Sequence, residues 1–335
     1  MYIITLDTGT TNTRVTLWEN NELIYKVYKE VGVRDTAIEG NNKKLKDSIK
    51  QSIEEVLDKN RLCLEDITKI IASGMLTSNV GIFEIKHLVA PVGIEDLAKN
   101  MVKKRFPEIV NKDIWFIPGI KNHSNQVTIE NCEEMDVMRG EEVETFGLIS
   151  KLQLKGPLLL ILPGSHSKFV TIDQNKKIIG CMTSLAGEMI SAITYNTILS
   201  DALGKSFATQ LKPKFLLDGV KMAKKFGINR SLFTLRVLDQ FSALSTQEKA
   251  NMLLGIILSD DIKAIKNSNA LDSTRDYQVV ISGKGILRDS FKTILDSDKE
   301  FIEVNSLSDA TSNDIAGYGA LCVNSIYEEI SSSRI

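Results

Sequence analysis

Residues 6–17 read LDTGTTNTRVTL, and residues 161–172 read ILPGSHSKFVTI. The two stretches align at a constant offset without a gap, so that Gly9 falls on Gly164 and Thr10 on Ser165. Each begins in an apolar run, passes through small polar residues and resumes as a Val-Thr-aliphatic strand. Chance similarity of two β-hairpins is the alternative, but both of the turns that follow match as well. The repetition predicts a duplicated domain.

Strand and helix signals alternate along the rest of the chain. Apolar residues at helical spacing predict a helix over Leu45–Leu57, and Ser245 with Glu248 forms a capping box that opens a helix through Leu258. Short runs rich in apolar residues predict strands at residues 2–6, 14–18, 22–27, 69–72, 158–162, 278–282 and 301–304. This alternation indicates an α/β protein, and a length of 335 residues suits two domains.

The composition limits the classes of partner. A formal net charge of -2 provides no basic field for nucleic acid or acidic membrane. The strongly apolar run Leu158–Leu162 is too short to cross a bilayer. The 4 cysteines form no CxxC pair and the 3 histidines no HxH or HxxxH spacing, which argues against disulfide frameworks and zinc. We expect a cytoplasmic protein without nucleic-acid or membrane partners; its oligomeric state stays open, a homodimer included.

The loop after Asp7 has the residue types that a phosphate site needs. Tight turns present backbone N–H groups to anions, and glycine allows close approach. Threonine and asparagine add short donors without bulk. A carboxylate at a strand end, here Asp7, can hold hydrated Mg²⁺ that faces the phosphates. Two such hairpins from two domains would grip one triphosphate from both sides.

At this point the sequence resembles the superfamily of acetate and sugar kinases, heat-shock proteins and actin. Residues 7–12 resemble its first phosphate motif, and residues 162–168 stand where its second belongs. Residues 279–287, VVISGKGIL, resemble its adenosine motif, and residues 310–321 resemble its C-terminal crossing helix, with Gly317 and Gly319 for close packing. The resemblance implies a duplicated ribonuclease-H-like, actin-like ATPase fold with mixed sheets flanked by helices around a central cleft. The implied domains are 1–145, with most of the sugar-acid site, and 146–335, with the adenosine motif.

The resemblance narrows to the 2-dehydro-3-deoxygalactonokinase family. The stretches that carry it are DTGTTN (7–12), ASGMLTS (72–78), IPG (117–119), DVMRGEE (136–142), LPGSHSKFV (162–170) and AGE (186–188). It implies ATP and Mg²⁺, with Asp7 on the metal side. The nucleotide-binding residues that it implies are Asp7, Gly9, Thr10, Thr11, Asn12, Gly164, Ser165, His166, Lys168, Gly283 and Gly285.

Phosphorylation of an alcohol needs a group that takes the hydroxyl proton. By analogy with the Gly-Asp-Gln stretch of related sugar kinases, we expect Glu141 to be this base, with Asp136 as the runner-up. The alternative is that Glu141 only offsets a helix dipole. Arg139 would pair with the substrate carboxylate or with a neighbouring glutamate, and His166 would contact phosphate or serve as a turn residue. Ser78 is a further candidate for a substrate contact.

We therefore expect an ATP-dependent kinase that phosphorylates 2-dehydro-3-deoxy-D-galactonate on its terminal hydroxyl, giving the 6-phosphate in galactonate degradation. A kinase of another small sugar acid or sugar is one alternative. A non-enzymatic nucleotide switch or filament of the actin type is another, because such proteins share both hairpins.

Overall fold

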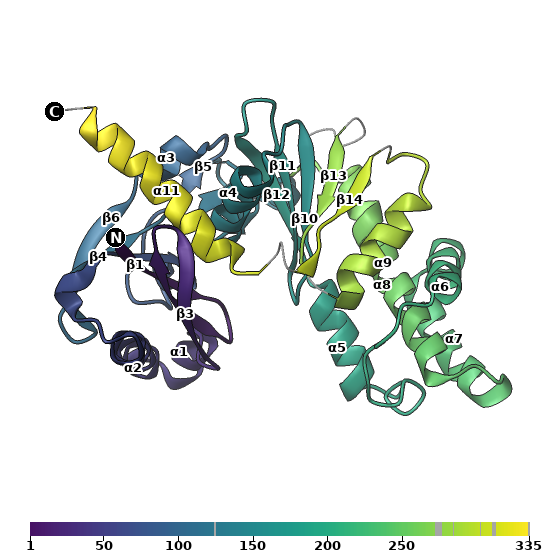
Figure 1. Ribbon diagram of the computed structural model, residues 1–335. Helices are drawn as coiled ribbons and strands as arrows, with labels where there is room; N and C mark the ends of the chain where they lie inside the picture. Colours follow the sequence, from purple (N-terminus) through teal and green to yellow (C-terminus); the bar gives the residue numbers. More distant parts are fainter. Residues whose placement is uncertain (124, 272–276, 284, 302, 310–312, 334–335) are drawn as a thin grey trace.

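A computed structural model describes residues 1–123, 125–271, 277–283, 285–301, 303–309 and 313–333. Two open sheets lie side by side, each flanked by helices (Figure 1). The first has the order β3-β2-β1-β4-β7-β6 and the second β12-β11-β10-β13-β14. The first sheet's strands are β1 Tyr2–Thr8, β2 Thr13–Glu19, β3 Glu22–Lys29, β4 Ile67–Gly74, β6 Val102–Phe106 and β7 Val110–Phe116. The second sheet's strands are β10 Leu158–Leu162, β11 Ser167–Ile172, β12 Ile178–Ser184, β13 Gln278–Ile281 and β14 Val304–Ser306.

The topology of the two sheets confirms the predicted duplication. In the first sheet β1 and β2 form an antiparallel hairpin, and β1 continues into the parallel pairs β1–β4 and β4–β7. In the second sheet β10 and β11 form the hairpin, and the parallel pairs are β10–β13 and β13–β14. The fold is thus the duplicated actin-like ATPase fold that the two hairpin sequences predicted.

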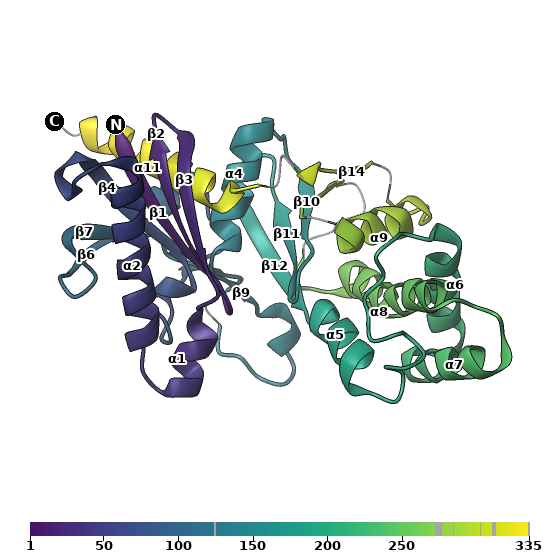
Figure 2. The ribbon, with the colours of Figure 1, turned by 60° about the horizontal axis from the view of Figure 1, so that its bottom comes forward.

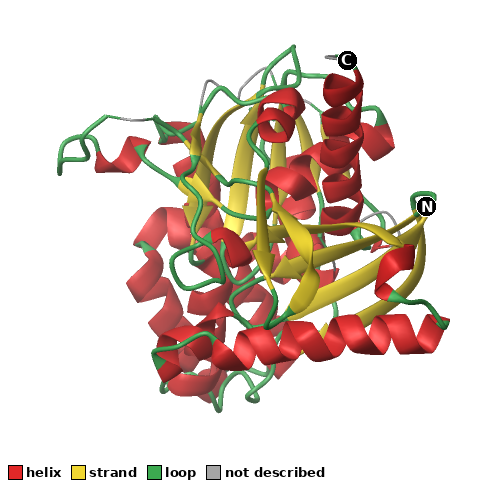
Figure 3. Ribbon diagram, turned by 90° about the vertical axis from the view of Figure 1, so that its left-hand side faces the viewer, coloured by secondary structure: helices red, strands yellow, loops and turns green. Residues whose placement is uncertain are grey.

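Helices cover both faces of the first sheet. Its outer face packs on α1 (Val33–Glu39) and α2 (Lys43–Asn60), whose predicted apolar residues Leu45, Ile49 and Ile53 are buried. Its inner face packs on α3 (Ile94–Lys99), α4 (Glu141–Leu152) and α11 (Ile315–Ser332). Consequently α2 and α11 lie on opposite sides of the sheet (Figures 2 and 3).

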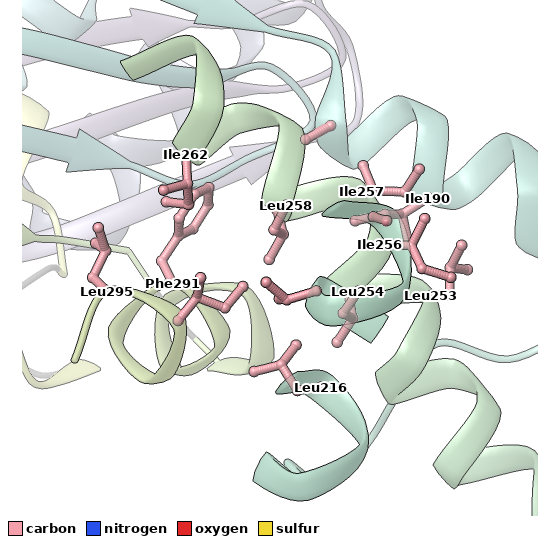
Figure 4. Close-up of a cluster of buried hydrophobic side chains, with 14 of the residues drawn as sticks. Ile190, Leu216, Leu253, Leu254, Ile256, Ile257, Leu258, Ile262, Phe291 and Leu295 are labelled. Carbon is pink, nitrogen blue, oxygen red and sulfur yellow. The ribbon is translucent and has the colours of Figure 1, made fainter. Parts of the chain in front are cut away.

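A separate core fills the far side of the second sheet. It is built by α5 (Ala186–Asn196), α6 (Pro213–Phe226), α7 (Ile228–Phe241), α8 (Thr246–Asn267) and α9 (Gly285–Asp296). In Figure 4, Leu258 and Ile262 of α8 meet Phe291 of α9. Alternate residues of β10 face opposite ways: Leu159 and Ile161 join this core, while Leu158, Leu160 and Leu162 join the core around α4 and α11. The strand is buried on both faces, as a continuous apolar run predicts.

Some element boundaries differ from the sequence prediction. The capping box at Ser245 and Glu248 is present, but α8 continues past Leu258 to Asn267. The strand expected at residues 301–304 lies at Val304–Ser306, and the crossing helix expected from residue 310 begins at Ile315; residues 310–312 are outside the described part. The predicted domain boundary at residue 145 lies inside α4 and stays a prediction. Three single 3₁₀ turns, η1 Leu64–Asp66, η2 Met75–Thr77 and η3 Cys132–Glu134, complete the described helices.

A small third sheet joins the two halves. It consists of β5 (Leu88–Val89), β8 (Ile120–Lys121) and β9 (Val137–Met138). Asn122 follows β8 and bonds to both backbone groups of Cys181 in β12: its Nδ2 donates to the carbonyl at 2.8 Å, and its Oδ1 accepts from the N–H at 2.9 Å. Helices of membrane-spanning length and apolarity are absent from the ranges that the structure describes.

Close packing of α11 accounts for both predicted glycines: Gly319 packs on the backbone of α4, whereas a Cβ on Gly317 would lie 2.6 Å from the Trp18 ring of β2. A Cβ on Gly319 would lie 2.0 Å from the Val143 carbonyl oxygen, and one on Gly147 would lie 3.1 Å from the Gly319 Cα. Lys69 of β4 also holds α11, because its Nζ donates to Asn324 at 2.7 Å and lies 4.2 Å from the Trp115 ring centroid. The two helices therefore cross at the closest approach that backbone atoms permit.

This crossing gives a stability prediction. Gly319→Ala must push α4 and α11 apart, so it should lower the free energy of unfolding by about 1–3 kcal/mol. Urea denaturation would measure the loss. Ser325→Ala, on an exposed position of α11, is the control and should unfold like the wild type. Equal midpoints for both variants would contradict the packing described.

Candidate active site

The first predicted phosphate loop is braced by the start of α1. Its closing bond runs from the Gly9 N–H to the Asn12 carbonyl at 2.9 Å. The N–H groups of Val33 and Arg34 donate to the carbonyls of Gly9 and Thr10 at 3.2 and 2.9 Å. A Cβ on Gly32 would lie 2.4 Å from the Thr10 oxygen, so a glycine is needed there for α1 to reach the loop. The loop carbonyls are thereby occupied by α1.

The second loop is braced in the same way by the start of α5. The Glu188 N–H donates to the Ser165 carbonyl at 3.1 Å. A Cβ on Gly187 would lie 2.2 Å from the Gly164 oxygen, so α5 contacts the loop backbone directly. The Glu188 carboxylate lies 2.9 Å from His166 Nε2, with both side chains partly exposed. His166 is thus held at the loop surface.

Both loops line one cavity of about 930 Å³. Its polar wall comes from the two loops, from Arg34 of α1 and from the start of α5. Its apolar wall comes from five side chains on four segments: Ile190, Phe207, Leu254, Ile286 and Leu287. Five of the predicted nucleotide-binding residues take part in the lining: Thr10, Thr11, Gly164, Ser165 and His166. A cavity with a polar end and an apolar end suits a ligand that has both phosphates and an aromatic base.

The predicted adenosine turn lies beside the second loop. The Ser282 N–H donates to the Ile161 carbonyl at 2.9 Å, and a Cβ on Gly283 would lie 3.2 Å from the Pro163 ring. Gly283 and Gly285 have φ of 87° and 62°, values that favour glycine. Because α9 starts at Gly285, this turn also sets Ile286 and Leu287 at the cavity wall.

Two glycines without side chains allow the segments that carry Asp7 and Glu141 to pack closely: Gly74 lies against Asp7, and Gly140 lies against Gly74. Gly74 ends β4, and a Cβ on it would lie 2.6 Å from the Thr8 oxygen and 3.1 Å from Asp7 Oδ1. A Cβ on Gly140 would lie 3.2 Å from the Gly74 Cα. Glu141, the first residue of α4, accepts from the Arg139 N–H at 3.1 Å. The carboxyl ends of β1 and β4 and the start of α4 therefore meet at one point.

Carboxylates gather at this point. Asp7 accepts from Arg14 Nη1 at 2.8 Å and lines a second cavity, of about 210 Å³, with Glu144 and Lys26. Burial and the charges of Glu141 and Asp7 raise the pKa of Glu144 to about 7. Within the described ranges, no group of three or more His, Cys, Asp and Glu side chains is arranged to hold a metal ion. A magnesium ion would have to be shared between Asp7, water and a ligand's phosphates.

Lys168 and Asp136, two predicted site residues, do not line the large cavity. They contact β9, β12 and each other. The buried Lys168 Nζ donates to the Val137 carbonyl at 2.8 Å and to Thr183, and lies 3.6 Å from Asp136. Asp136 accepts from the Thr183 N–H at 2.6 Å and from its hydroxyl at 2.9 Å. These contacts tie β9 to the second sheet, so the two residues have structural partners where a phosphate contact and a base were expected.

Arg139 and Ser78 also have protein partners. The Arg139 guanidinium donates to the Thr77 hydroxyl and the Ile85 carbonyl, both at 2.6 Å, and holds the loop after β4. Among the described residues its guanidinium contacts carbonyl and hydroxyl oxygens and His87 instead of a glutamate, so the ion pair that was one of the two expectations is not formed. Ser78 Oγ donates to the Met75 carbonyl at 2.7 Å. Roles of either residue toward a substrate stay predictions.

Sequence reasoning missed several residues of the site. Phe207 and Leu254 lie on segments without a motif, so only the fold could bring them to the cavity. Glu188 carried a signal, because it belongs to the AGE stretch that follows β12. Asn12 lines neither cavity described above; its side chain accepts from the Tyr28 hydroxyl at 2.6 Å and donates to Thr11 at 2.9 Å, so it orders the loop.

The chain has a duplicated actin-like fold, and one cavity with polar and apolar lining residues lies between its two phosphate-type loops. These features define the class of sugar kinases and related ATPases. Comparisons with known proteins narrow this class. The model of the 2-keto-3-deoxy-galactonokinase family matches residues 7–316. The chain therefore belongs to this family of sugar kinases.

A solved structure with a TM-score well above 0.5 shares the fold, and two more distant ones are given for comparison. A proposed 2-dehydro-3-deoxygalactonokinase from Sinorhizobium meliloti is 21% identical, with 96% of each chain covered and a TM-score of 0.74. The activator of 2-hydroxyisocaproyl-CoA dehydratase from Clostridium difficile, with bound ADPNP, is 13% identical over 99% of this chain and 98% of that one, with a TM-score of 0.47. Component A of (R)-2-hydroxyglutaryl-CoA dehydratase from Acidaminococcus fermentans is 12% identical over 97% and 99%, with a TM-score of 0.49. No sequence among the curated proteins matches this chain.

The loop glycines give a testable contrast. Around a Cβ on Gly9 or Gly164, the nearest described protein atoms lie 4.0 and 3.5 Å away, so protein packing does not require glycine there. Gly9→Ala and Gly164→Ala should fold normally but bind an ATP analogue about tenfold or more weakly, because the methyl group occupies ligand space. Calorimetric titration would measure the affinity. Gly187→Ala, which clashes with the second loop's backbone, should lose stability instead. Unchanged affinity in both loop variants would contradict a phosphate role for the loops.

Proposed function

We propose that the protein is an ATP-dependent kinase that phosphorylates 2-dehydro-3-deoxy-D-galactonate on its terminal hydroxyl, giving the 6-phosphate and ADP. The observation that carries the proposal is the single cavity lined by both phosphate-type loops. Membership of the 2-keto-3-deoxy-galactonokinase family supports the choice of sugar acid. ATP as the donor fits a cytoplasmic location.

The two loops would hold the triphosphate from opposite sides. Thr10 and Thr11 would face it from the first half, with Gly9 beside them in the loop, and Ser165 and His166 from the second. The adenosine part would lie against the apolar wall near Leu254 and Leu287, beside the turn at Gly283. Mg²⁺ held by Asp7 through water would offset charge on the phosphates. The polar wall suits phosphates, because it contains small hydroxyl side chains, Arg34 and His166, and the carboxylate of Glu188 lies 2.9 Å from His166 Nε2.

Glu141 would act as the general base. It takes the proton of the terminal hydroxyl while the oxygen forms a bond to the γ-phosphorus and the bond from that phosphorus to the β-phosphate oxygen breaks, which releases ADP. Its place supports this role, because the start of α4 meets the end of β1 through Gly74 and Gly140.

The sugar acid, which accepts the phosphoryl group, would bind near the end of β4 and the small sheet. Strand ends in α/β folds commonly face ligands, and η2 and Ser78 follow the end of β4. Arg139 lies between this loop and Glu141, so a substrate carboxylate near it would compete with the carbonyls that its guanidinium now contacts. We propose Ser78 and Arg139 as the residues that face the sugar acid.

Removing the base is the direct test. Glu141→Gln keeps the shape of the side chain but cannot take a proton, so kcat should fall about 10²–10⁴-fold. Affinity for an ATP analogue should stay at the wild-type value, because Glu141 does not line the large cavity. Glu95→Gln, an exposed position, is the matched control. Turnover close to wild type in Glu141→Gln would overturn the assignment.

The acceptor itself is tested by ADP release with a panel of compounds. We expect turnover with 2-dehydro-3-deoxy-D-galactonate to exceed that with neutral sugars, since the family points to a sugar acid, and its gluconate-derived epimer in the panel measures the stereochemical preference. A preference for a neutral sugar would contradict the proposed acceptor while leaving the kinase class intact. Hydrolysis that no acceptor stimulates, together with filament formation, would favour a nucleotide switch.

A further inference from the structure

Two adjacent glutamates open α4, and they have opposite environments. Glu141 is partly exposed, whereas Glu142 is 0% exposed. Glu142 Oε2 accepts from the Gly140 N–H at 2.7 Å. Its Oε1 is buried and has no hydrogen-bond partner among the described residues. One carboxyl group of the pair is therefore withdrawn from solvent while its neighbour is not.

Backbone N–H groups and the charge of Arg139 offset a negative charge on Glu142 only in part, because burial and the charge of Glu141 outweigh them. Its one cationic neighbour on the same segment, Arg139, directs its guanidinium to Thr77 and Ile85. A buried carboxylate without a cation or several donors costs more than its protonated form, so the group becomes neutral. Burial and the charge of Glu141 raise the pKa of Glu142 to about 8. The proton makes Glu142 an uncharged acid at neutral pH.

The bond that the Glu142 carboxyl accepts from the Gly140 N–H holds an unusual turn. Gly140 has φ of 114° and contacts Gly74, so it is the pivot between β9 and α4. The amide of Gly140 is held by Glu142, and the preceding amide, of Arg139, is held by Glu141. The orientation of Glu141 thus depends on the turn at Gly140, whose amide is bonded to Glu142.

We propose that Glu142 is a positioning residue for the phosphoryl-transfer site: a neutral carboxylic acid that holds the Gly140 amide and leaves Glu141 as the charged member of the pair. This inference rests on the proposed function, since it assigns a task to the neighbour of the proposed base. A charge on Glu142 would repel Glu141 and disturb the turn, because like charges in one buried site oppose each other.

Several charged or titratable groups surround Glu142 and enter its pH dependence. Arg139 and Glu141 act on it from its own segment. Across the interface, Cys181 of β12 is within reach of Glu142, and Lys168 and Asp136 act on the same thiol. Burial raises the pKa of Cys181, so this thiol stays neutral and adds no charge in the pH range of interest.

The test compares kcat for two substitutions of Glu142. If Glu142 is a base, the Asp variant should be the faster of the two; if it is a neutral positioning acid, the Gln variant should be the faster. Glu142→Gln keeps the length and neutrality, so it should lower kcat less than about threefold, whereas Glu142→Asp is too short to reach Gly140 and should lower kcat more than about tenfold. The KM for ATP should stay constant in both. Glu54→Gln, exposed on α2, is the control. A higher kcat in Glu142→Asp than in Glu142→Gln would overturn the proposal.

The pH profile gives a second readout. Wild-type kcat should fall above about pH 8 as Glu142 ionises. In Glu142→Gln this alkaline limb should move to higher pH or disappear. An alkaline limb unchanged by Glu142→Gln would contradict the proposed role.

A measurement without substrate separates this inference from the proposed function. The folded protein holds the Glu142 proton up to about pH 8, above the usual carboxyl value, so the group stabilises the fold at low pH and the contribution is lost as pH rises from about 5 to 8. The Tm of the wild type should fall relative to Glu142→Gln over this range. If it does while no acid is phosphorylated, the buried neutral acid stands and the proposed function fails. Parallel Tm curves would overturn the neutral acid itself.

Discussion

The contact between Gly140 and Gly74 is the constraint on which the site depends. Both glycines have positive φ, 114° and 73°, and a Cβ on either would meet backbone or Asp7 within 3.2 Å. Larger residues would separate the start of α4 from the ends of β1 and β4. Because Asp7 lies next to the last residue of β1 and Glu141 begins α4, that separation would move the proposed metal-side carboxylate away from the proposed base. The positions of the two groups are therefore set by backbone packing, which is stiffer than any side-chain contact.

The duplication is less symmetric than the aligned sequences imply. Asp7 faces Arg14 across the first hairpin, and the aligned residue Leu162 faces Lys168 across the second. The ungapped alignment would place Phe169, not Lys168, opposite Leu162, so the second hairpin pairs one residue out of step. A one-residue change in register moves each side chain to the other face of its strand. Lys168 consequently takes the place of Arg14 and bonds to β9, away from the second loop.

This register change shows how far sequence alone could predict the site. Gly9 and Gly164 were predictable because turn chemistry is local, and the duplicated sheet followed from two matching hairpins. Glu142 was not, since nothing in the sequence separates a buried glutamate from an exposed one beside it. Phe207 and Leu254 were not either, because they reach the cavity through the packing of α8 and its neighbours. Local patterns fix loops and strands, whereas register and helix packing decide which side chains share a cavity.

The small sheet limits how the halves can move. Val92, before α3, forms a reciprocal backbone pair with Ile178 at 2.9 and 2.8 Å, and Asn122 and Asp136 bond to β12. These bonds attach the segment that precedes α4 to the second sheet, although its strands come before α4 in the chain. A closing movement around the proposed nucleotide must either break these bonds or carry the small sheet along with the second half. The second course keeps the bonds to β12. Because β1 pairs with β4 along its whole length, the β1–β2 hairpin then moves together with the first sheet and α1, and the narrowing of the large cavity falls between Thr10 and Ser165.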